Sequence, residues 1–443
     1  MAHDQLPNPA HGDDPAVDGT PRLSAVPVRP VTDRWSQPRA ADGSYVALER
    51  RDLPALTSLR FFAAIYVVVH HLINIGLLQT QGAGADRSAT WYLAWGTQGH
   101  VGVTFFFVLS GFILAWCYHQ AFSTDDAERR STITRTFWFA RFARVWPLHA
   151  AMLIAFVPFA LSEAGVALSG LVTTAWHGAL NLLLLHAWVP TGTADGLSDT
   201  CNAPSWTLSV EACFYLLFPL MATLLVARLR WGTAQLALLI GGSWITLGAV
   251  GWYLDGSGDV GEWAMRVLPA TRLADFVIGV ALGLIVVQGL QRAKLRDEPQ
   301  TTRASTAWTA LETFVLVAAC ASPLVWALGA SDQLPATLGS SWFHLPTIVA
   351  SILVIALERG AISRRLLALR PLVWLGEVSY AMYLTHLFLV LAAYRIGVYD
   401  LLGVWGASAL LLVAAVVVSG IVHERFEKPA RARLVARRAR RAQ

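Results

Sequence analysis

The chain is poor in charged residues. Asp, Glu, Lys and Arg together make up 14% of its 443 residues, against about 25% in an average soluble domain. This deficit, together with 55% hydrophobic residues and a mean hydropathy of +0.50, excludes an ordinary soluble protein. The net charge of +5 comes mainly from the chain ends, so we expect no nucleic-acid partner.

Cysteine is also scarce, and the motifs of several protein classes are missing. The four cysteines, Cys117, Cys201, Cys213 and Cys320, show no C-x-x-C spacing, so we expect neither a metal site nor a disulfide framework. No G-x-x-x-x-G-K-[ST] phosphate loop occurs. Residues 1–50 are polar and lack the apolar core of a signal peptide. They are predicted to form a disordered cytoplasmic tail.

What the chain has instead is a series of long apolar runs. Runs of this length cross a bilayer as helices. The predicted fold class is therefore all-α, a polytopic transmembrane helical bundle that occupies residues 51–427. The eleven runs lie at 55–79, 101–120, 145–163, 168–189, 206–227, 234–254, 268–288, 306–329, 344–357, 372–394 and 402–423.

Basic residues between the runs predict the topology. The positive-inside rule assigns basic clusters to the cytoplasm, and one cluster is the tail 428–443, with seven cations and no acid. Both termini are therefore expected in the cytoplasm, beside an inner or plasma membrane whose lipid bilayer the tail contacts. The loop 190–205, which includes Asp195, has no basic residue and is expected outside. An even number of crossings then requires about ten spans, with 168–189 as one re-entrant or tilted segment.

The first run, "SLRFFAAIYVVVHH", carries polar groups inside the membrane. Arg60 opens its apolar part, and His70 and His71 follow it. A charged or titratable residue in a bilayer is costly and marks a candidate functional site. On a helix Arg60 and His71 share a face to within about 20°, about 16 Å apart, while His70 points about 80° away. This spacing suits a long substrate with an anionic head and a reactive far end. The alternative is an interfacial arginine with a histidine that bonds a neighbouring helix.

Two further motifs carry charge. "RFARVWPLH" places Arg141 and Arg144 one turn apart, ahead of Pro147 near the expected start of the next helix. Their planar guanidinium groups suit phosphates, although such a pair is also an ordinary positive flank. "PSWTLSVEACFYLLFP" places Glu211 about 8 Å below the outer end of its helix, at the expected depth of His71. We predict a Glu211–His71 pair in which the carboxylate orients the imidazole; the alternatives are a structural pair and a carboxylate that faces water.

Polar residues recur in two later runs. "SYAMYLTH" carries Ser379, Tyr383 and His386 on one helical face. They are candidates for lining the same cavity, and a satisfied core histidine is the alternative for His386. "TRLADFVIG" adds Arg272 and Asp275 near an outer helix end, where they either line the cavity or pair with each other.

Taken in order, seven stretches resemble the membrane acyltransferase 3 family and together span residues 56 to 429. The family's Arg-x10-His falls on Arg60 and His71, and its Arg-x-x-Arg falls on Arg141 and Arg144. Phe-Phe replaces the family's common glycine after the first arginine, and no Ser-Gly-Asn-His esterase domain follows. The acceptor is therefore expected to be handled by the membrane domain or by a partner. The stretches are "LTSLRFFAAIYVVVHH", "HVGVTFFFVLSGFIL", "RFARVWPLH", "PSWTLSVEACFYLLFP", "TRLADFVIGV", "LGEVSYAMYLTH" and "HERFEKP".

The resemblance implies an integral-membrane O-acyltransferase. Its co-substrate would be cytoplasmic acyl-CoA, with acetyl-CoA favoured, and it would have no bound cofactor or metal. The acceptor would be a hydroxyl of a carbohydrate or glycan at the cell envelope, with a secondary metabolite such as a macrolide polyketide as the alternative. A transporter and a non-catalytic scaffold are the rival classes.

The resemblance and the helix geometry together suggest roles for the polar residues. Arg60, Arg141 and Arg144 would hold the CoA phosphates. His71 would be catalytic, either as a general base or as a transient acyl acceptor, and Glu211 would orient it. Sequence leaves both routes open.

Overall fold

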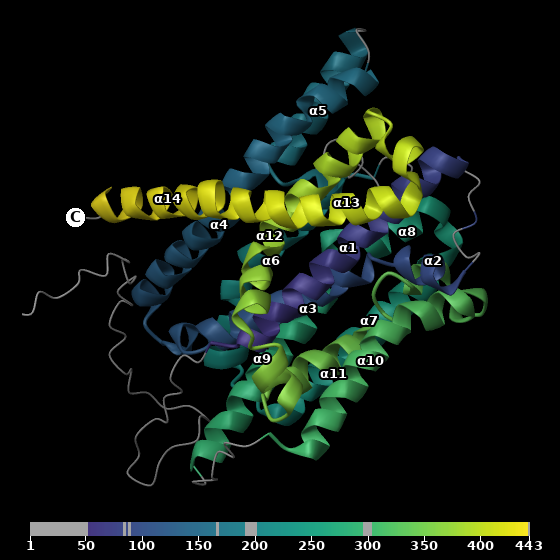
Figure 1. Ribbon diagram of the computed structural model, residues 1–443. Coiled ribbons are helices and arrows are strands. Elements are labelled where there is room, and N and C mark those ends of the chain that lie inside the picture. Colours follow the sequence, from purple (N-terminus) through teal and green to yellow (C-terminus); the bar gives the residue numbers. More distant parts are fainter. Residues whose placement is uncertain are drawn as a thin grey trace, which may run out of the picture. The chain divides into compact units, whose positions relative to one another are not determined.

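Helices make up nearly all of the described part of the chain, and no strand occurs there (Figure 1). The computed structural model describes residues 52–82, 86, 90–164, 168–190, 202–295 and 304–441. The predicted all-α membrane bundle is confirmed. The predictions for residues 1–50 and for Asp195 lie outside the described residues.

Fourteen α-helices are described. They are α1 (Pro54–Gln81), α2 (Trp91–Gly96), α3 (Val101–Tyr118), α4 (Ala127–Ala164), α5 (Leu168–Leu182), α6 (Trp206–Ala222), α7 (Thr233–Leu254), α8 (Gly258–Arg266), α9 (Pro269–Leu295), α10 (Thr306–Leu328), α11 (Leu345–Ala356), α12 (Arg370–Arg395), α13 (Val398–Val422) and α14 (Lys428–Arg441). Two of them, α6 and α13, continue directly into short π-helical segments.

Nine stretches of helix among the described residues are long and apolar enough to cross a membrane. They correspond to nine of the ten expected spans. The remaining expected span, the run 344–357, forms α11, which has only 12 residues and measures about 18 Å, against about 30 Å for the hydrocarbon core. The run 168–189 forms the 15-residue α5 and then leaves the helix near Leu184, where φ is 58°. The cytoplasmic location of both termini stays a prediction.

Glycines let the central helices approach one another closely. A Cβ atom on Gly279 of α9 would clash with the Val108 carbonyl oxygen of α3, and one on Gly376 of α12 would clash with the Thr57 carbonyl oxygen of α1. Small residues permit such backbone contacts between membrane helices. Because α1 also packs against α3 and α13, the directions of its polar side chains are fixed along its length.

Two helices extend beyond the predicted apolar runs. The helix α4 begins at Ala127, so Arg141, Arg144 and Pro147 lie well inside it. The predicted helix start near Pro147 is therefore wrong, because the polar stretch before the apolar run folds as part of the same helix. The last run continues from α13 through the π-helical segment His423–Glu427, named η10, into α14. The basic tail is thus a helix as far as Arg441 (Figure 1).

Candidate active site

Two adjoining pockets open among the helices around α1. We call the first the arginine pocket and the second the histidine pocket. Both have Val103 of α3 and Tyr383 of α12 in their walls. The arginine pocket contains about 420 Å³ of empty space and is lined by Arg60, Val103, Phe106, Phe107, Thr207, Leu208, Glu211, Ser379, Tyr380 and Tyr383. The histidine pocket contains about 510 Å³ and is lined by Val67, His70, His71, His100, Val103, Ala203, Pro204, Trp206, Arg266 and Tyr383.

The two predicted residues of α1 lie in different pockets. Arg60 lines the arginine pocket and His71 lines the histidine pocket. The eleven-residue spacing on one helix therefore reaches from one pocket to the next. A single extended molecule that passes the shared wall at Val103 and Tyr383 could contact both residues.

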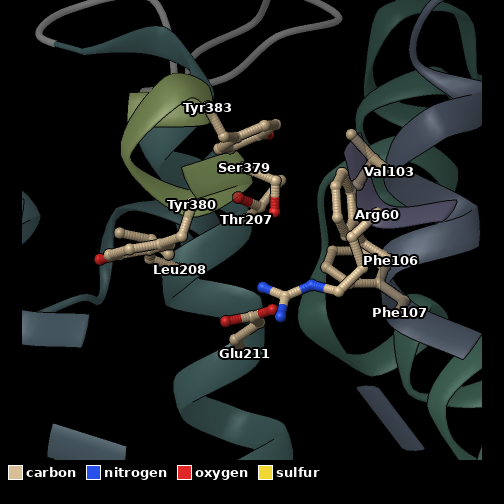
Figure 2. Close-up of a pocket in the computed structure, with 10 residues that line it drawn as sticks. All are labelled: Arg60, Val103, Phe106, Phe107, Thr207, Leu208, Glu211, Ser379, Tyr380 and Tyr383. Atoms are coloured by element: carbon tan, nitrogen blue, oxygen red, sulfur yellow. The ribbon is translucent and has the colours of Figure 1, made fainter. Parts of the chain in front are cut away.

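Glu211 faces Arg60 across the arginine pocket. Figure 2 shows the guanidinium group of Arg60 pointing towards the carboxylate of Glu211, which projects from α6. Tyr215, one turn further along α6, donates a hydrogen bond of 2.9 Å from its hydroxyl to Glu211 Oε2. A carboxylate inside a bundle needs such partners to offset the loss of hydration. Glu211 is thus held between a cation and a phenol.

The predicted Glu211–His71 pair is wrong in its partners. The reason is that α6 begins inside the bundle, where the residue before it, Ser205, is buried. The residues at its start, Pro204 and Trp206, line the histidine pocket beside His71, and Asn202 Nδ2 donates a buried hydrogen bond of 3.0 Å to a carbonyl of α12. Glu211 lies five residues further on, about 7.5 Å along the helix, and so it reaches the depth of Arg60.

Arg141 and Arg144 of α4 lie next to the arginine pocket. The Cζ atom of Arg141 is 5.9 Å from the ring centroid of Tyr215, and that of Arg144 is 5.9 Å from the ring centroid of Tyr380. Both arginines interact electrostatically with Glu211. Arg141 Nε is buried and has no hydrogen-bond partner among the described residues. The structure therefore brings together the three arginines that sequence selected, with donor capacity left over.

His386 is a side chain that contacts His71. His386 Nε2 lies 3.2 Å from His71 Nδ1, and the two ring centroids are 5.0 Å apart. His71 Nδ1 also lies 2.9 Å from the Val67 carbonyl oxygen, and His386 Nδ1 lies 3.1 Å from the Met382 carbonyl oxygen.

These contacts fix the tautomers of the two neutral rings. A carbonyl oxygen can only accept a hydrogen bond, so each Nδ1 must carry the proton. The Nε2 of His386 then accepts from His71 Nδ1, and in each neutral ring the Nε2 is the nitrogen without a proton. An imidazole oriented in this way has the arrangement that a general base requires.

His70 also lines the histidine pocket, so the prediction that it points elsewhere is wrong. Its Nδ1 donates to the Thr97 carbonyl oxygen over 2.6 Å, and its ring stands nearly perpendicular to that of His71, at 86°. Although the two residues are separated by about 80° around the helix, the pocket is wide enough for both to line it.

The three residues predicted to share a face of α12 all lie at the two pockets. Ser379 and Tyr383 line the arginine pocket, and His386 contacts His71. Sequence reasoning missed Tyr215, His100 and Arg266. The four-residue spacing between Glu211 and Tyr215 could have revealed Tyr215. His100 and Arg266 reach the histidine pocket through tertiary contacts, which no local sequence pattern predicts.

Arg272 and Asp275 line neither pocket. They pair with each other at 3.1 Å, and the exposed fractions of their side chains are 2% and 0%. Ser341 donates to Asp275 Oδ1 over 2.5 Å, and Arg272 Nη2 donates to Thr104 over 2.8 Å. The pair ties α9 to α3 and to the turn before α11, so we assign it to the support of the bundle.

Residues 53–424 match the profile of the acyltransferase 3 family, described as an acyltransferase domain. The chain is 31% identical over 406 residues to acyltransferase MdmB of Streptomyces mycarofaciens, a match that covers 87% of this chain and 93% of that protein. No solved structure gives a significant match.

Two weaker relatives are named as O-acetyltransferases. One is "Putative peptidoglycan O-acetyltransferase YrhL" of Bacillus subtilis (strain 168), 23% identical over 346 residues, with 76% of this chain and 48% of that protein covered. The other is O-acetyltransferase OatA of Staphylococcus aureus (strain NCTC 8325 / PS 47), 24% identical over 345 residues, with 76% and 50% covered. The chain spans about half the length of these two proteins.

The buried pair yields a stability prediction. Asp275→Ala leaves the Arg272 charge buried without its carboxylate, which should lower the free energy of unfolding by about 3–5 kcal/mol. Glu424→Ala removes an exposed pair with Lys428, whose N–O distance is 2.7 Å, and should cost at most about 1 kcal/mol. Thermal unfolding of both variants in one detergent checks the difference. Equal melting temperatures would contradict the supporting role.

Proposed function

Because this chain belongs to the membrane acyltransferase 3 family, we propose that it transfers an acyl group, with acetyl favoured, from acyl-CoA to a hydroxyl of a carbohydrate or glycan at the cell envelope. The resemblance found in the seven motifs is confirmed as family membership, and the protein is an O-acyltransferase. The observation that carries the proposal is the succession of an arginine pocket and a histidine pocket along one face of α1.

The arginine pocket suits the nucleotide head of the donor. Phosphate groups form strong charge-assisted hydrogen bonds with guanidinium forks, and Arg60, Arg141 and Arg144 supply three of them. We propose that the pocket opens to the cytoplasm, because basic clusters flank the helices on that side in the predicted topology. The pantetheine arm would then extend past Tyr383 and bring the thioester to His71.

The histidine pocket suits the chemical step. His71 Nε2 would accept the proton of the acceptor hydroxyl while the oxygen attacks the thioester carbonyl carbon. As the tetrahedral intermediate collapses, the carbon–sulfur bond breaks, and the thiolate of CoA takes the proton from the imidazolium. In the alternative route, His71 attacks first and the acyl group rests on the imidazole before it reaches the hydroxyl. His386 positions the ring in both routes.

Glu211 would act through Arg60. Since it faces Arg60 and accepts from Tyr215, its charge holds the guanidinium group extended across the arginine pocket. We therefore reassign it from the orientation of His71 to the positioning of the donor site. Removal of its charge should affect donor affinity more than the rate of the chemical step.

A hydroxyl of a secondary metabolite, such as a macrolide, is the second candidate acceptor. The observation that favours it is one of similarity. The chain is 31% identical to a Streptomyces protein named only as an acyltransferase, and 23% and 24% identical to the two relatives named as O-acetyltransferases.

Mass spectrometry of surface glycans and extracted metabolites tests the function. A strain that lacks this protein should lose one acyl group from one of the two classes of molecule, and expression of the intact chain should restore it. Expression of His71→Ala should not. Unchanged acylation in both classes, with altered uptake or export of a solute, would favour a transporter.

The histidine pair yields a kinetic prediction. His71→Ala should lower the rate of acyl transfer by about 10²- to 10⁴-fold, because general-base assistance is worth that much, while affinity for CoA is nearly retained. His386→Ala should lower the same rate less, since it removes the orientation of the base and leaves the base itself. Single-turnover acyl transfer in purified protein, with CoA binding measured in parallel, checks both.

His70→Ala is the matched control for this prediction, because His70 lies in the same pocket and lacks the contact with His386. We expect a smaller loss of rate than for His71→Ala. If His70→Ala were the more damaging change, the base would have to be reassigned.

The arginine pocket yields a binding prediction. Arg141→Ala and Arg144→Ala should each weaken CoA binding, because a charge-assisted hydrogen bond contributes about 1.5–3 kcal/mol. Lysine at either position should restore only part of the affinity, since it lacks the bidentate fork. Isothermal titration of CoA into the purified variants checks the order arginine, lysine, alanine. A double variant with unchanged affinity would remove both residues from the donor site.

A further inference from the structure

The C-terminal helix α14 packs along the first half of α4. Arg438 Nη1 donates a hydrogen bond of 3.1 Å to the Arg135 carbonyl oxygen, and its Cζ atom lies 4.5 Å from the ring centroid of Phe139. These contacts fix the face that α14 turns towards α4. They also fix the register of the two helices, with Arg438 of α14 beside Arg135 and Phe139 of α4.

Arg431 lies on that same face. It precedes Arg438 by seven residues, so the two side chains point the same way to within about 20° and lie about 10 Å apart along the axis. Arg431 interacts electrostatically with Arg144 and Arg141. Later residues of α14 therefore contact earlier residues of α4, and the two helices run antiparallel, with Arg431 opposite the turn that carries the arginine pair.

The burial of the arginines on α14 agrees with this register. Arg431 is half-buried, whereas Arg433, which lies about 200° further around the helix, is exposed. The segment before Arg431 is also tied into the bundle. Glu427, one turn earlier, is 5% exposed and lies 2.8 Å from His423 Nδ1 through its Oε2 atom. Arg60 interacts electrostatically with Glu427, so the segment η10 passes beside the arginine pocket.

The resulting cluster has an excess of positive charge. Four arginines, 60, 141, 144 and 431, gather with two carboxylates, Glu211 and Glu427, which leaves two positive charges in a partly buried place. Like charges at close range repel strongly where water is scarce. An anion with more than one charge would relieve this repulsion, and a nucleotide phosphate is such an anion.

The four cations lie on three helices in a connected series. Arg60 shares α1 with His71 and interacts with Arg144 of α4, and Arg144 in turn interacts with Arg431 of α14. In CoA the thioester lies at one end of the molecule, and the phosphate on the ribose 3′ position lies at the other. If the thioester reaches His71, the 3′-phosphate lies at the end of the series, where α14 passes.

We propose that Arg431 binds the 3′-phosphate of the CoA donor, so that α14 forms one wall of the donor site. This inference rests on the proposed function, because it takes acyl-CoA as the donor. It gives α14 a role that a membrane-anchoring tail does not have. The diphosphate would remain with Arg60, Arg141 and Arg144.

The test compares CoA with dephospho-CoA, which lacks only the 3′-phosphate. Arg431→Ala should weaken CoA binding about tenfold or more, as expected for the loss of one charge-assisted hydrogen bond, and should leave the affinity for dephospho-CoA unchanged. Arg431→Lys should give an intermediate affinity for CoA. Arg433→Ala removes the same charge from the exposed face of the same helix and should change neither affinity.

Titration of both ligands into the full-length purified proteins gives distinct outcomes. If Arg431→Ala binds CoA as well as Arg433→Ala does, or loses both ligands equally, the assignment is overturned. Weaker binding to vesicles that contain anionic lipid, with CoA affinity unchanged, would overturn it in favour of a membrane anchor. A wild-type protein that binds neither ligand would contradict the proposed donor itself, which is a separate failure.

Discussion

A charge inside a membrane bundle must have a partner, and the arrangement around Arg60 follows from that constraint. Transfer of a guanidinium group out of water costs several kcal/mol unless an anion faces it. Glu211 provides the anion, and Tyr215 completes the shell of Glu211 with a hydrogen bond of 2.9 Å. Arg141 and Arg144 lie next to this pair, and the resulting excess of positive charge is what the proposed donor site uses to bind an anion.

The same helix connects this receptor to a different chemistry. Because α1 is packed against α3, α12 and α13, His71 is held at a fixed distance and direction from Arg60. No carboxylate is among the described residues that line the histidine pocket; there His71 contacts the imidazole of His386. In the proposed function, one rigid helix thus separates the recognition of charge from the transfer of a proton.

Much of this site could be predicted from sequence. Arg60, His71 and the pair Arg141 and Arg144 depend on helical spacing, which local geometry determines, and the structure gathers the arginines as expected. The pairing of Glu211 with Arg60 could not be predicted, because it depends on where α6 begins relative to the other helices. An apolar run reveals the length of a helix and says nothing of the depth at which it starts.

Two further features lie beyond local patterns for the same reason. The contact of His71 with His386 joins residues 315 positions apart, and the position of Arg431 depends on the continuation of α13 into α14 beside α4. The sequence 428–443 reads as a basic tail by composition alone, since nothing in it shows which helix it contacts. In the folded chain these cations lie on two faces of α14, one packed against α4 and one exposed.

In the proposed function, one donor molecule bridges the two pockets. A structure of the protein with a non-transferable thioether analogue of acetyl-CoA bound would show whether it does. We expect the diphosphate oxygens within about 3 Å of the guanidinium nitrogens of Arg60, Arg141 or Arg144. We expect the carbon that replaces the reacting carbonyl to lie near His71 Nε2, with room for an acceptor oxygen about 3–3.5 Å from that carbon. An analogue that binds with its nucleotide in the histidine pocket, or outside both pockets, would contradict this arrangement.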